Sequence, residues 1–266
     1  MDRTTAPSPT RARAGRDDDA RRVALVTGAT SGIGAATALE LAWRGLRVVV
    51  LGRDAERGAG VVERIRASGG QAALVTADLC DDDALESAVD EAAAVWGRLD
   101  HAFNNAGVTG PGTVADARVE DFDRAFAVNT RALWLCMRAE VRHMTVSGGG
   151  SIVNNLSVHS VRTVFRGVAP YAASKAAALA LTRCAAVELA DQSIRVNGVA
   201  SGPVDTGMFA GPGMAPPGAD AWDTLLPMGR AGTTGEVADA VAWLFSDEAR
   251  YVTGNVIAVD GGFLAR

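Results

Sequence analysis

Two side chains that can exchange protons with a substrate, Tyr171 and Lys175, are four residues apart. On a helix, positions i and i+4 lie on one face, so the phenol and the ammonium can point into the same cleft. A free tyrosine titrates near ~10, and a neighbouring cation favours the phenolate and lowers that pKa. The spacing therefore predicts an acid–base pair in which Tyr171 exchanges a proton with a carbonyl or alcohol oxygen.

Lysine usage points to the same position. The chain has 26 basic residues, and Lys175 is the single lysine among arginines. An ammonium is a compact charge that can reach ribose hydroxyls as well as the phenol, whereas a guanidinium is a broad planar fork. We interpret this lysine as marking a position where an ammonium is required.

A glycine-rich turn lies between the first apolar run and the first helical pattern. Glycines allow a tight turn, and the N-terminus of the helix offers free N–H groups and partial positive charge to a pyrophosphate. The spacing is G-x-x-x-G-x-G, because Thr30 occupies the second glycine position of the G-x-G-x-x-G fingerprint. The turn predicts a dinucleotide site that includes Gly28, Thr30, Ser31, Gly32, Ile33 and Gly34.

The end of the second apolar run bears on which dinucleotide binds. An acid there would accept hydrogen bonds from the ribose of NAD, whereas an arginine would neutralise the 2′-phosphate of NADP. Gly52 occupies the acidic position and Arg53 follows it, so NADP(H) is favoured. NAD(H) is the alternative, because a shifted loop would bring Asp54 to the ribose. Asp78 and Leu79 are expected at the adenine edge, with a helix N-cap as the alternative role for this segment.

Short apolar runs alternate with helical patterns along the chain. Runs without polar alternation, separated by helices, indicate a parallel sheet covered on both faces. The expected fold is a single α/β domain over 22–266, with a doubly wound, Rossmann-like, seven-stranded sheet. Residues 1–21 are interpreted as a disordered tail, and 205–229 as a mobile substrate lid. Strands are expected at Val23–Thr27, Arg47–Leu51, Ala72–Ala77, Leu99–Phe103, Ser151–Leu156, Ile194–Val199 and Asn255–Val259, and helices near 33–43, 55–67, 83–96, 117–145, 171–190 and 235–246.

Composition narrows the class of protein. The 266 residues carry a formal net charge of −5, so no nucleic-acid partner is expected. No apolar run approaches the roughly 20 residues of a membrane span, and no secretory signal is expected. Cys80, Cys136 and Cys184 are interpreted as reduced thiols of a cytoplasmic protein. His101 and His143 show no ligand spacing, so no metal site is expected.

Further motifs follow in a fixed order: Asn104-Asn105-Ala106-Gly107, Asn129, Ser157, Ser201–Thr206, and Tyr251–Gly254 running to Val259–Gly262. Together with the glycine-rich turn and the Tyr–Lys pair, they resemble the short-chain dehydrogenase/reductase family from Arg22 to the C-terminus. The resemblance implies the sheet order 3-2-1-4-5-6-7, hydride transfer between a nicotinamide and a carbonyl or alcohol carbon, and a homotetramer or homodimer.

The resemblance also implies roles for the matching residues. Tyr171 resembles the general acid/base, and Lys175 the group that lowers its pKa and holds the nicotinamide ribose. Ser157 resembles the hydroxyl that orients the substrate oxygen, and Asn129 the residue that holds a water linking Lys175 to solvent. Cofactor contacts are implied at Asn105, Ala106, Gly107, Pro203, Val204 and Thr206.

One departure concerns the serine. Ser157 and Tyr171 are one residue farther apart than is usual in the family. We keep Ser157, because a one-residue slip of the strand would turn its faces over. A slipped strand would instead bring Val158 to the serine position or leave Ser160 to serve.

Other departures lie close to the expected site. Asn155 places an amide in a buried strand, where it needs partners, and Ser201 replaces the proline usual after the sixth strand. His159 is a candidate substrate contact, with a loop histidine at the pocket rim as the alternative.

The main hypothesis is an NADP(H)-dependent oxidoreductase that acts on a carbonyl or secondary alcohol of a medium-sized, mainly apolar substrate. The Met, Leu and Trp residues of the expected lid favour an adaptable apolar pocket. A pathway ketoreductase or a 3-oxoacyl reductase would fit. The alternatives are a non-redox enzyme of the same scaffold (elimination, epimerisation or cyclisation) and a non-catalytic dinucleotide-binding module.

Overall fold

The computed structural model describes residues 22–163, 165–206 and 225–266, which contain one seven-stranded sheet. Neighbouring strands pair in parallel in the order β3-β2-β1-β4-β5-β6-β7, which confirms the expected doubly wound fold. The strands are β1 (Val23–Thr27), β2 (Arg47–Gly52), β3 (Gln71–Thr76), β4 (His101–Asn104), β5 (Gly150–Asn155), β6 (Ile194–Ser201) and β7 (Val256–Val259).

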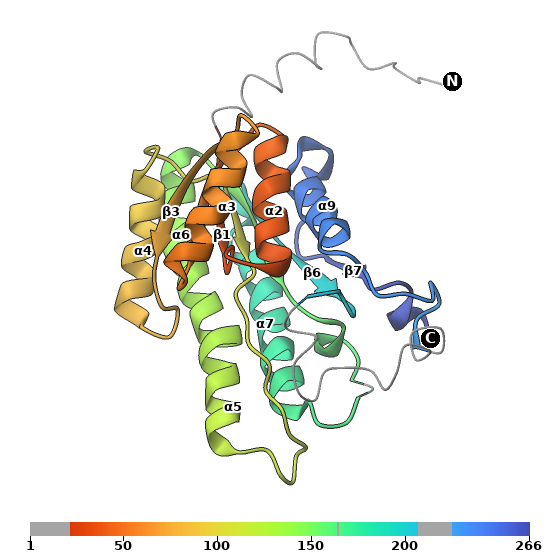
Figure 1. Ribbon diagram of the computed structural model, residues 1–266. Helices are drawn as coiled ribbons and strands as arrows, with labels where there is room; N and C mark the ends of the chain where they lie inside the picture. Colours follow the sequence, from red (N-terminus) through yellow and green to blue (C-terminus); the bar gives the residue numbers. More distant parts are fainter. Residues whose placement is uncertain (1–21, 164, 207–224) are drawn as a thin grey trace, which may run out of the picture.

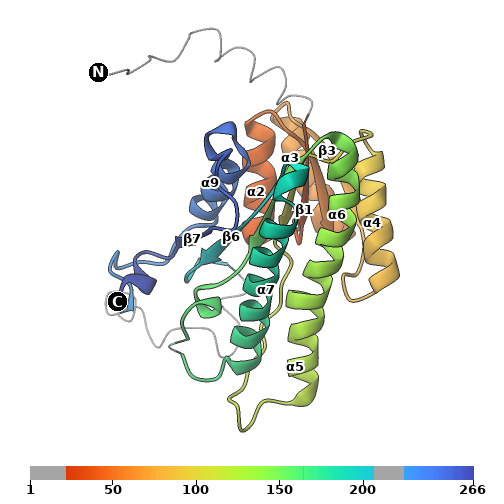
Figure 2. The same ribbon diagram turned by 180° about the vertical axis from the view of Figure 1, so that it is seen from behind.

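Helices cover both faces of the sheet. One face carries α2 (Gly32–Trp43), α3 (Ala55–Ala67) and α9 (Thr234–Phe245), which lie in front in Figure 1. The other face, seen in Figure 2, carries α4 (Asp82–Ala94), α6 (Leu133–Ser147) and α7 (Ala169–Glu188). In the same view α5 (Val119–Phe126) continues the line of α6 beyond the edge of the sheet.

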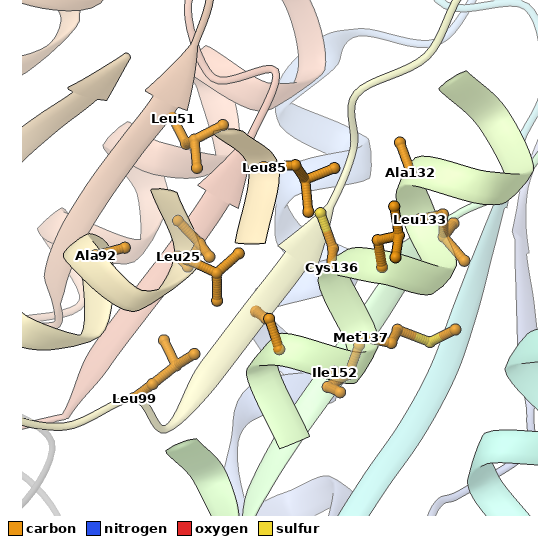
Figure 3. Packing of buried hydrophobic residues seen from close by; sticks show 14 of the residues in the cluster. Leu25, Leu51, Leu85, Ala92, Leu99, Ala132, Leu133, Cys136, Met137 and Ile152 are labelled. Atoms are coloured by element: carbon orange, nitrogen blue, oxygen red, sulfur yellow. The ribbon is translucent and has the colours of Figure 1, made fainter. Parts of the chain in front are cut away.

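Two apolar cores form because successive residues of a buried strand face opposite sides. Leu25 of β1 packs in the core beneath α4 and α6, whereas its neighbour Val26 packs in the core beneath α2 and α9. Figure 3 shows the first core, where Leu25 lies among Leu51, Leu85 and Cys136. The two cores fix the sheet between its helix layers and so hold the carboxyl ends of the strands in place.

The long helix predicted over 117–145 is interrupted. A π-helical turn, η1 (Ala127–Ala132), joins α5 to α6. Such turns insert an extra residue into the helical repeat and often lie at functional sites. Apolar periodicity does not reveal the turn, because it requires only a local shift of the backbone hydrogen bonds.

Two predicted segments fall wholly or mainly outside the described residues: the tail at 1–21, and 207–224 of the lid expected at 205–229. Within the described ranges, no helix is long and apolar enough to cross a membrane.

Candidate active site

A cleft of ≈ 1120 Å³ opens at the carboxyl ends of the strands. Ligands of open parallel sheets bind where the strand order reverses, which here is between β1 and β4. Of the predicted site residues, Gly34 and Asn129 lie outside the lining of this cleft. The others line it: Gly28, Thr30, Ser31, Gly32, Ile33, Arg53, Asp78, Leu79, Asn105, Ala106, Gly107, Ser157, His159, Tyr171, Lys175, Pro203, Val204 and Thr206.

The glycine-rich turn forms one wall through close backbone contacts. Gly28 has a φ of +62°, and a Cβ there would lie 2.9 Å from the Cα of Ala106, so a larger residue would not fit. Ser31 precedes α2 without capping it through its side chain, and the first turn of α2 contains no acid. The helix N-terminus therefore offers N–H groups and partial positive charge to an anion in the cleft.

Gly34 lies behind this turn. A Cβ at this position would collide with the carbonyl oxygen of Gly28 and with the side-chain Nδ2 of Asn105. Its absence lets α2 pack closely against the turn, so Gly34 shapes the site without lining it.

At the far end of the cleft, Asp54 is held by Arg57. Asp54 accepts a hydrogen bond from the backbone N–H of Arg57 at 2.9 Å and pairs with the Arg57 guanidinium at 2.7 Å. These contacts cap α3, and the backbone hydrogen bond is the main reason that the pKa of Asp54 lies below its usual value. Asp54 is thus engaged at a helix N-terminus, while Arg53 is exposed at the cleft.

The segment after β3 lines the cleft and does not cap α4. Asp78 accepts a hydrogen bond from the backbone N–H of Cys80 at 3.0 Å, whereas α4 is capped by Asp81. The N-cap alternative for Asp78 is therefore wrong, and both Asp78 and Leu79 line the cleft.

At the opposite end of the cleft, Ser157 and Tyr171 face each other. Tyr171 lies in the first turn of α7, just after Pro170, and Ser157 follows β5. The Ser157 hydroxyl lies close enough to the Tyr171 phenol to act on its pKa, and both side chains are buried, with exposures of 4% for Ser157 and 7% for Tyr171. Such a pair can hold one substrate oxygen between two hydroxyls.

The slipped-strand alternatives do not match this arrangement. The Val158 side chain packs with Leu226 and Phe263 in an apolar cluster. Ser160 donates its hydroxyl back to the carbonyl oxygen of Ser157. The extra residue between Ser157 and Tyr171 is therefore accommodated after the serine, with β5 in register.

Lys175 lies one helical turn after Tyr171 and is 4% exposed. Its Nζ donates a hydrogen bond to the carbonyl oxygen of Asn155 at 2.6 Å. Burial lowers the pKa of Lys175 to about 8. Burial also raises the pKa of Tyr171, opposed by the hydrogen bond from Ser157. The predicted lowering of the Tyr171 pKa by Lys175 is not found, because loss of solvation outweighs the other contributions.

Asn129 occupies the π-helical turn and is fully buried behind Gly107. Its side chain donates to the carbonyl oxygen of Val108 at 2.9 Å and to the Ser174 hydroxyl at 3.0 Å, and accepts from the N–H of Val108 at 2.9 Å. Both amide hydrogens are therefore used within the protein. These contacts tie η1 to α7 beside Lys175, which gives Asn129 a positioning role, and its water-holding role stays a prediction.

Asn155 finds the partners that its burial requires. Its Nδ2 donates to Asn105 Oδ1 at 2.9 Å, and its Oδ1 accepts from the Ser201 hydroxyl at 3.5 Å. Asn105 in turn donates to the carbonyl oxygens of Thr27 and Gly28. The two departures from the family pattern, Asn155 and Ser201, are thus in contact, and together they link the ends of β6, β5, β4 and β1.

The segment after β6 approaches the glycine-rich turn from the other side. Val204 forms a bridge with Gly232, and the Thr206 methyl group would lie 3.6 Å from a Cβ at Gly32. Pro203 and Thr206 therefore bound the cleft opposite α2, as expected.

Sequence reasoning missed several lining residues, among them Arg57, Arg124, Phe165 and Val168. Arg57 could have been found, because an acid at the N-cap and a base three residues later commonly pair. Phe165 and Val168 lie in a loop without periodicity, so no local signal identified them.

The described residues fit a dinucleotide. An uncapped helix N-terminus beside glycines with no room for a Cβ suits a pyrophosphate, Arg53 suits a phosphate at one end, and the Tyr171–Lys175 pair lies at the other.

Comparisons with known proteins agree with this geometry. The sequence profile described as enoyl-(acyl carrier protein) reductase matches residues 28–264. The chain is 41% identical to cis-4-hydroxycyclohexanecarboxylate dehydrogenase of Sinomonas cyclohexanicum, covering 92% of this chain and 98% of the relative. It is 38% identical to a versicolorin reductase of Emericella nidulans, covering 91% and 95%. A crystal structure of a short-chain dehydrogenase from Burkholderia cenocepacia in complex with NADP aligns with a TM-score of 0.85 and 36% identity, covering 92% and 98%.

The chain belongs to the short-chain dehydrogenase/reductase family. It is an oxidoreductase of the nicotinamide-dependent type that acts on alcohol and ketone groups.

Proposed function

We propose that this oxidoreductase uses NADP(H) to interconvert a ketone and a secondary alcohol on a medium-sized, mainly apolar substrate. The observation that carries the proposal is the buried Ser157–Tyr171 hydroxyl pair, one helical turn from Lys175, at the end of the cleft opposite Arg53. When bound, the nicotinamide would supply or accept the hydride.

The protein's own residues would manage the substrate oxygen. In the reductive direction, Ser157 donates a hydrogen bond to the carbonyl oxygen and Tyr171 transfers its phenolic proton to that oxygen. Lys175, held by the Asn155 carbonyl, favours the resulting phenolate and presents its remaining N–H groups to the ribose. Asn129 keeps Lys175 in place through η1 and α7.

The preference for NADP(H) rests on the arginine side of the cleft. Asp54 caps α3 and pairs with Arg57, so it is engaged away from a ribose, while Arg53 is exposed for a phosphate. Titration with both dinucleotides tests this, and Arg53→Ala should weaken NADPH binding about 10-fold or more with little effect on NADH. Arg64→Ala, which changes an exposed arginine of α3, is the control. Tighter binding of NADH than NADPH by the unchanged chain would overturn the preference.

The substrate proposal rests on the wall next to Ser157. Val158 and Phe165 line the cleft there, and the buried Leu226 and Phe263 pack behind them. This wall suits an alicyclic or fused-ring carbonyl compound, as in a biosynthetic pathway ketoreductase, and the cyclohexane-ring and versicolorin relatives support the same class. A panel of ketones and alcohols followed by nicotinamide absorbance tests it. Product formation without a stoichiometric absorbance change would favour the non-redox alternative.

We further propose a homotetramer in the cytoplasm. Phe122 of α5, Trp134 of α6 and Val187 of α7 are exposed by 44%, 43% and 82%, which leaves apolar surface on these helices for packing between subunits. Cys80, Cys136 and Cys184 are free thiols, in keeping with a reducing compartment. Light scattering after size exclusion would give the mass, and a monomer at micromolar concentration would contradict the assembly.

A further inference from the structure

A third polar side chain, His159, lies at the reacting end of the cleft. It belongs to the short turn Val158–Ser160, and its backbone N–H donates to the Ser157 hydroxyl at 3.2 Å. The side chain is 7% exposed and lines the cleft. Its ring meets the Tyr171 ring edge-on, with 6.1 Å between centroids. The imidazole is therefore directly beside the phenol that would hold the substrate oxygen.

The imidazole has an unmet hydrogen-bonding requirement. Its Nδ1 is buried and has no hydrogen-bond partner among the described residues. Buried polar atoms in native proteins are nearly always paired, so an unpaired one needs an explanation. His159 lines the cleft, so a small rotation of the buried imidazole would turn this nitrogen toward a ligand that can provide the partner.

The surroundings determine which kind of ligand group can do so. Phe165 lies edge-on to the imidazole at 5.4 Å and contacts Phe263 at 5.7 Å, so an apolar wall adjoins the ring. Burial lowers the pKa of His159, so the ring is neutral at neutral pH. A neutral imidazole donates through one nitrogen and accepts through the other, and it adds no charge. It matches a hydroxyl or a carbonyl oxygen; a carboxylate would be better served by the exposed Arg166 at the same cleft.

We propose that His159 binds a second, uncharged oxygen of the substrate, so that the favoured substrates are apolar-ring ketones or alcohols with a hydroxyl or carbonyl oxygen close to the reacting carbon. The inference rests on the proposed function, which supplies the first oxygen at Ser157 and Tyr171. With the two rings in contact, we place the second oxygen on a neighbouring carbon or the next one.

The first test compares substrates that differ by one oxygen. kcat/KM is measured with NADP for cyclohexanol, cyclohexane-1,2-diol and cyclohexane-1,3-diol. We expect the unchanged chain to prefer at least one diol over cyclohexanol by about 10-fold or more, since a site built to pair a hydroxyl discriminates against the analogue without it. His159→Phe should remove most of this preference, and His159→Asn, which keeps a polar atom near the Nδ1 position, should retain part of it.

The control and the contrary outcomes are specific. His143→Gln, which alters an imidazole on the surface of α6, should keep the full diol preference. The inference is overturned by equal kcat/KM for diols and cyclohexanol, or by a diol preference that survives in His159→Phe. The third contrary outcome concerns a charged substrate. If His159→Phe loses kcat/KM for cis-4-hydroxycyclohexanecarboxylate but keeps the diol preference, His159 binds a carboxylate, and the uncharged-oxygen assignment is overturned.

A second measurement separates this inference from the proposed function. The chain has three histidines, so labelling them with nitrogen-15 gives few ring resonances, and His159→Phe identifies one pair. Adding the preferred diol to the NADP complex should shift the His159 nitrogens, whereas cyclohexanol should not. A shift without any turnover would overturn the proposed redox function and keep the His159 contact. Turnover without a shift of the His159 nitrogens would overturn the His159 contact and keep the proposed redox function.

Discussion

The Lys175 ammonium donates a hydrogen bond to the carbonyl oxygen of Asn155 at 2.6 Å. Asn155 is the last residue of β5, so the charge is positioned by the backbone of the sheet and not by an acidic side chain. The same residue holds Asn105 through its amide, and Asn105 holds the glycine-rich turn. Lys175 and the glycine-rich turn, at two ends of the cleft, are therefore linked through Asn155.

Tyr171→Phe should reduce turnover at least ~10²-fold with little loss of dinucleotide affinity, because only the transferable proton is removed. The chain has one other tyrosine, Tyr251, which is fully exposed, so Tyr251→Phe is a matched control that should retain full activity. Steady-state rates and fluorescence titration of NADPH give the two quantities. Unchanged turnover in Tyr171→Phe would mean that another group supplies the proton.

Lys175→Arg should be about as damaging, ~10²-fold, although the positive charge remains. The ammonium fills a space in which a Cβ added at Gly107 would already lie 3.5 Å from Nζ, and a guanidinium is larger. Arg183→Lys, an exposed change on the same helix, is the control and should be silent. Wild-type rates in Lys175→Arg would show that any cation suffices.

The lowered pKa of Lys175 also predicts a pH dependence. With a pKa of about 8, the amine loses its charge as the pH rises through that value, so kcat/KM for the dinucleotide should fall above about pH 8. Lys175→Arg should lack this decline, because a guanidinium stays charged. A wild-type profile that is flat from pH 7 to 10 would contradict the burial of the amine in the working enzyme.

Much of the fold was predictable because its signals are local. Each strand run was placed within two residues, and the sheet order followed from the family motifs. What the sequence did not show depends on contacts between distant segments. The Asn155–Ser201 contact joins residues 46 apart in the chain. The direction of the Tyr171 pKa was missed for a similar reason: spacing reveals the nearby cation, but burial is a property of the whole packed domain.

Asn155→Leu should raise KM for NADPH about 10-fold, because it leaves Asn105 Oδ1 without its donor and loosens the hold on Gly28. The neighbouring Asn154 faces the opposite side of the sheet, where it bonds Thr182 at 2.9 Å. Asn154→Leu should therefore lower the melting temperature without raising KM, and Thr182→Val provides a milder change on that side. Equal KM in the Asn155 and Asn154 variants would reduce Asn155 to a purely structural role.

Glu140→Gln should stabilise the protein at neutral and alkaline pH. Glu140 is fully buried in α6, accepts a hydrogen bond from Asn104 Nδ2 at 3.0 Å, and has its pKa raised to about 8 by burial. The Glu140 carboxyl has a higher pKa in the folded state than in the unfolded state. It therefore makes its full contribution to the free energy of unfolding only when the pH is below the unfolded-state pKa. That stability is lost as the pH rises from about 4.5 to about 8, on the order of 1 kcal/mol per pH unit.

Glutamine keeps the shape and the acceptor for Asn104 but cannot ionise, so the free energy of unfolding of Glu140→Gln should lose this decline between pH 5 and pH 8. Urea titrations at several pH values measure it, and Glu91→Gln, an exposed change on α4, is the control that should preserve the wild-type slope. If Glu140→Gln and the unchanged chain show parallel profiles, the carboxyl must be solvated or paired in solution, and the buried polar cluster between β4 and α6 would have to open in the native state.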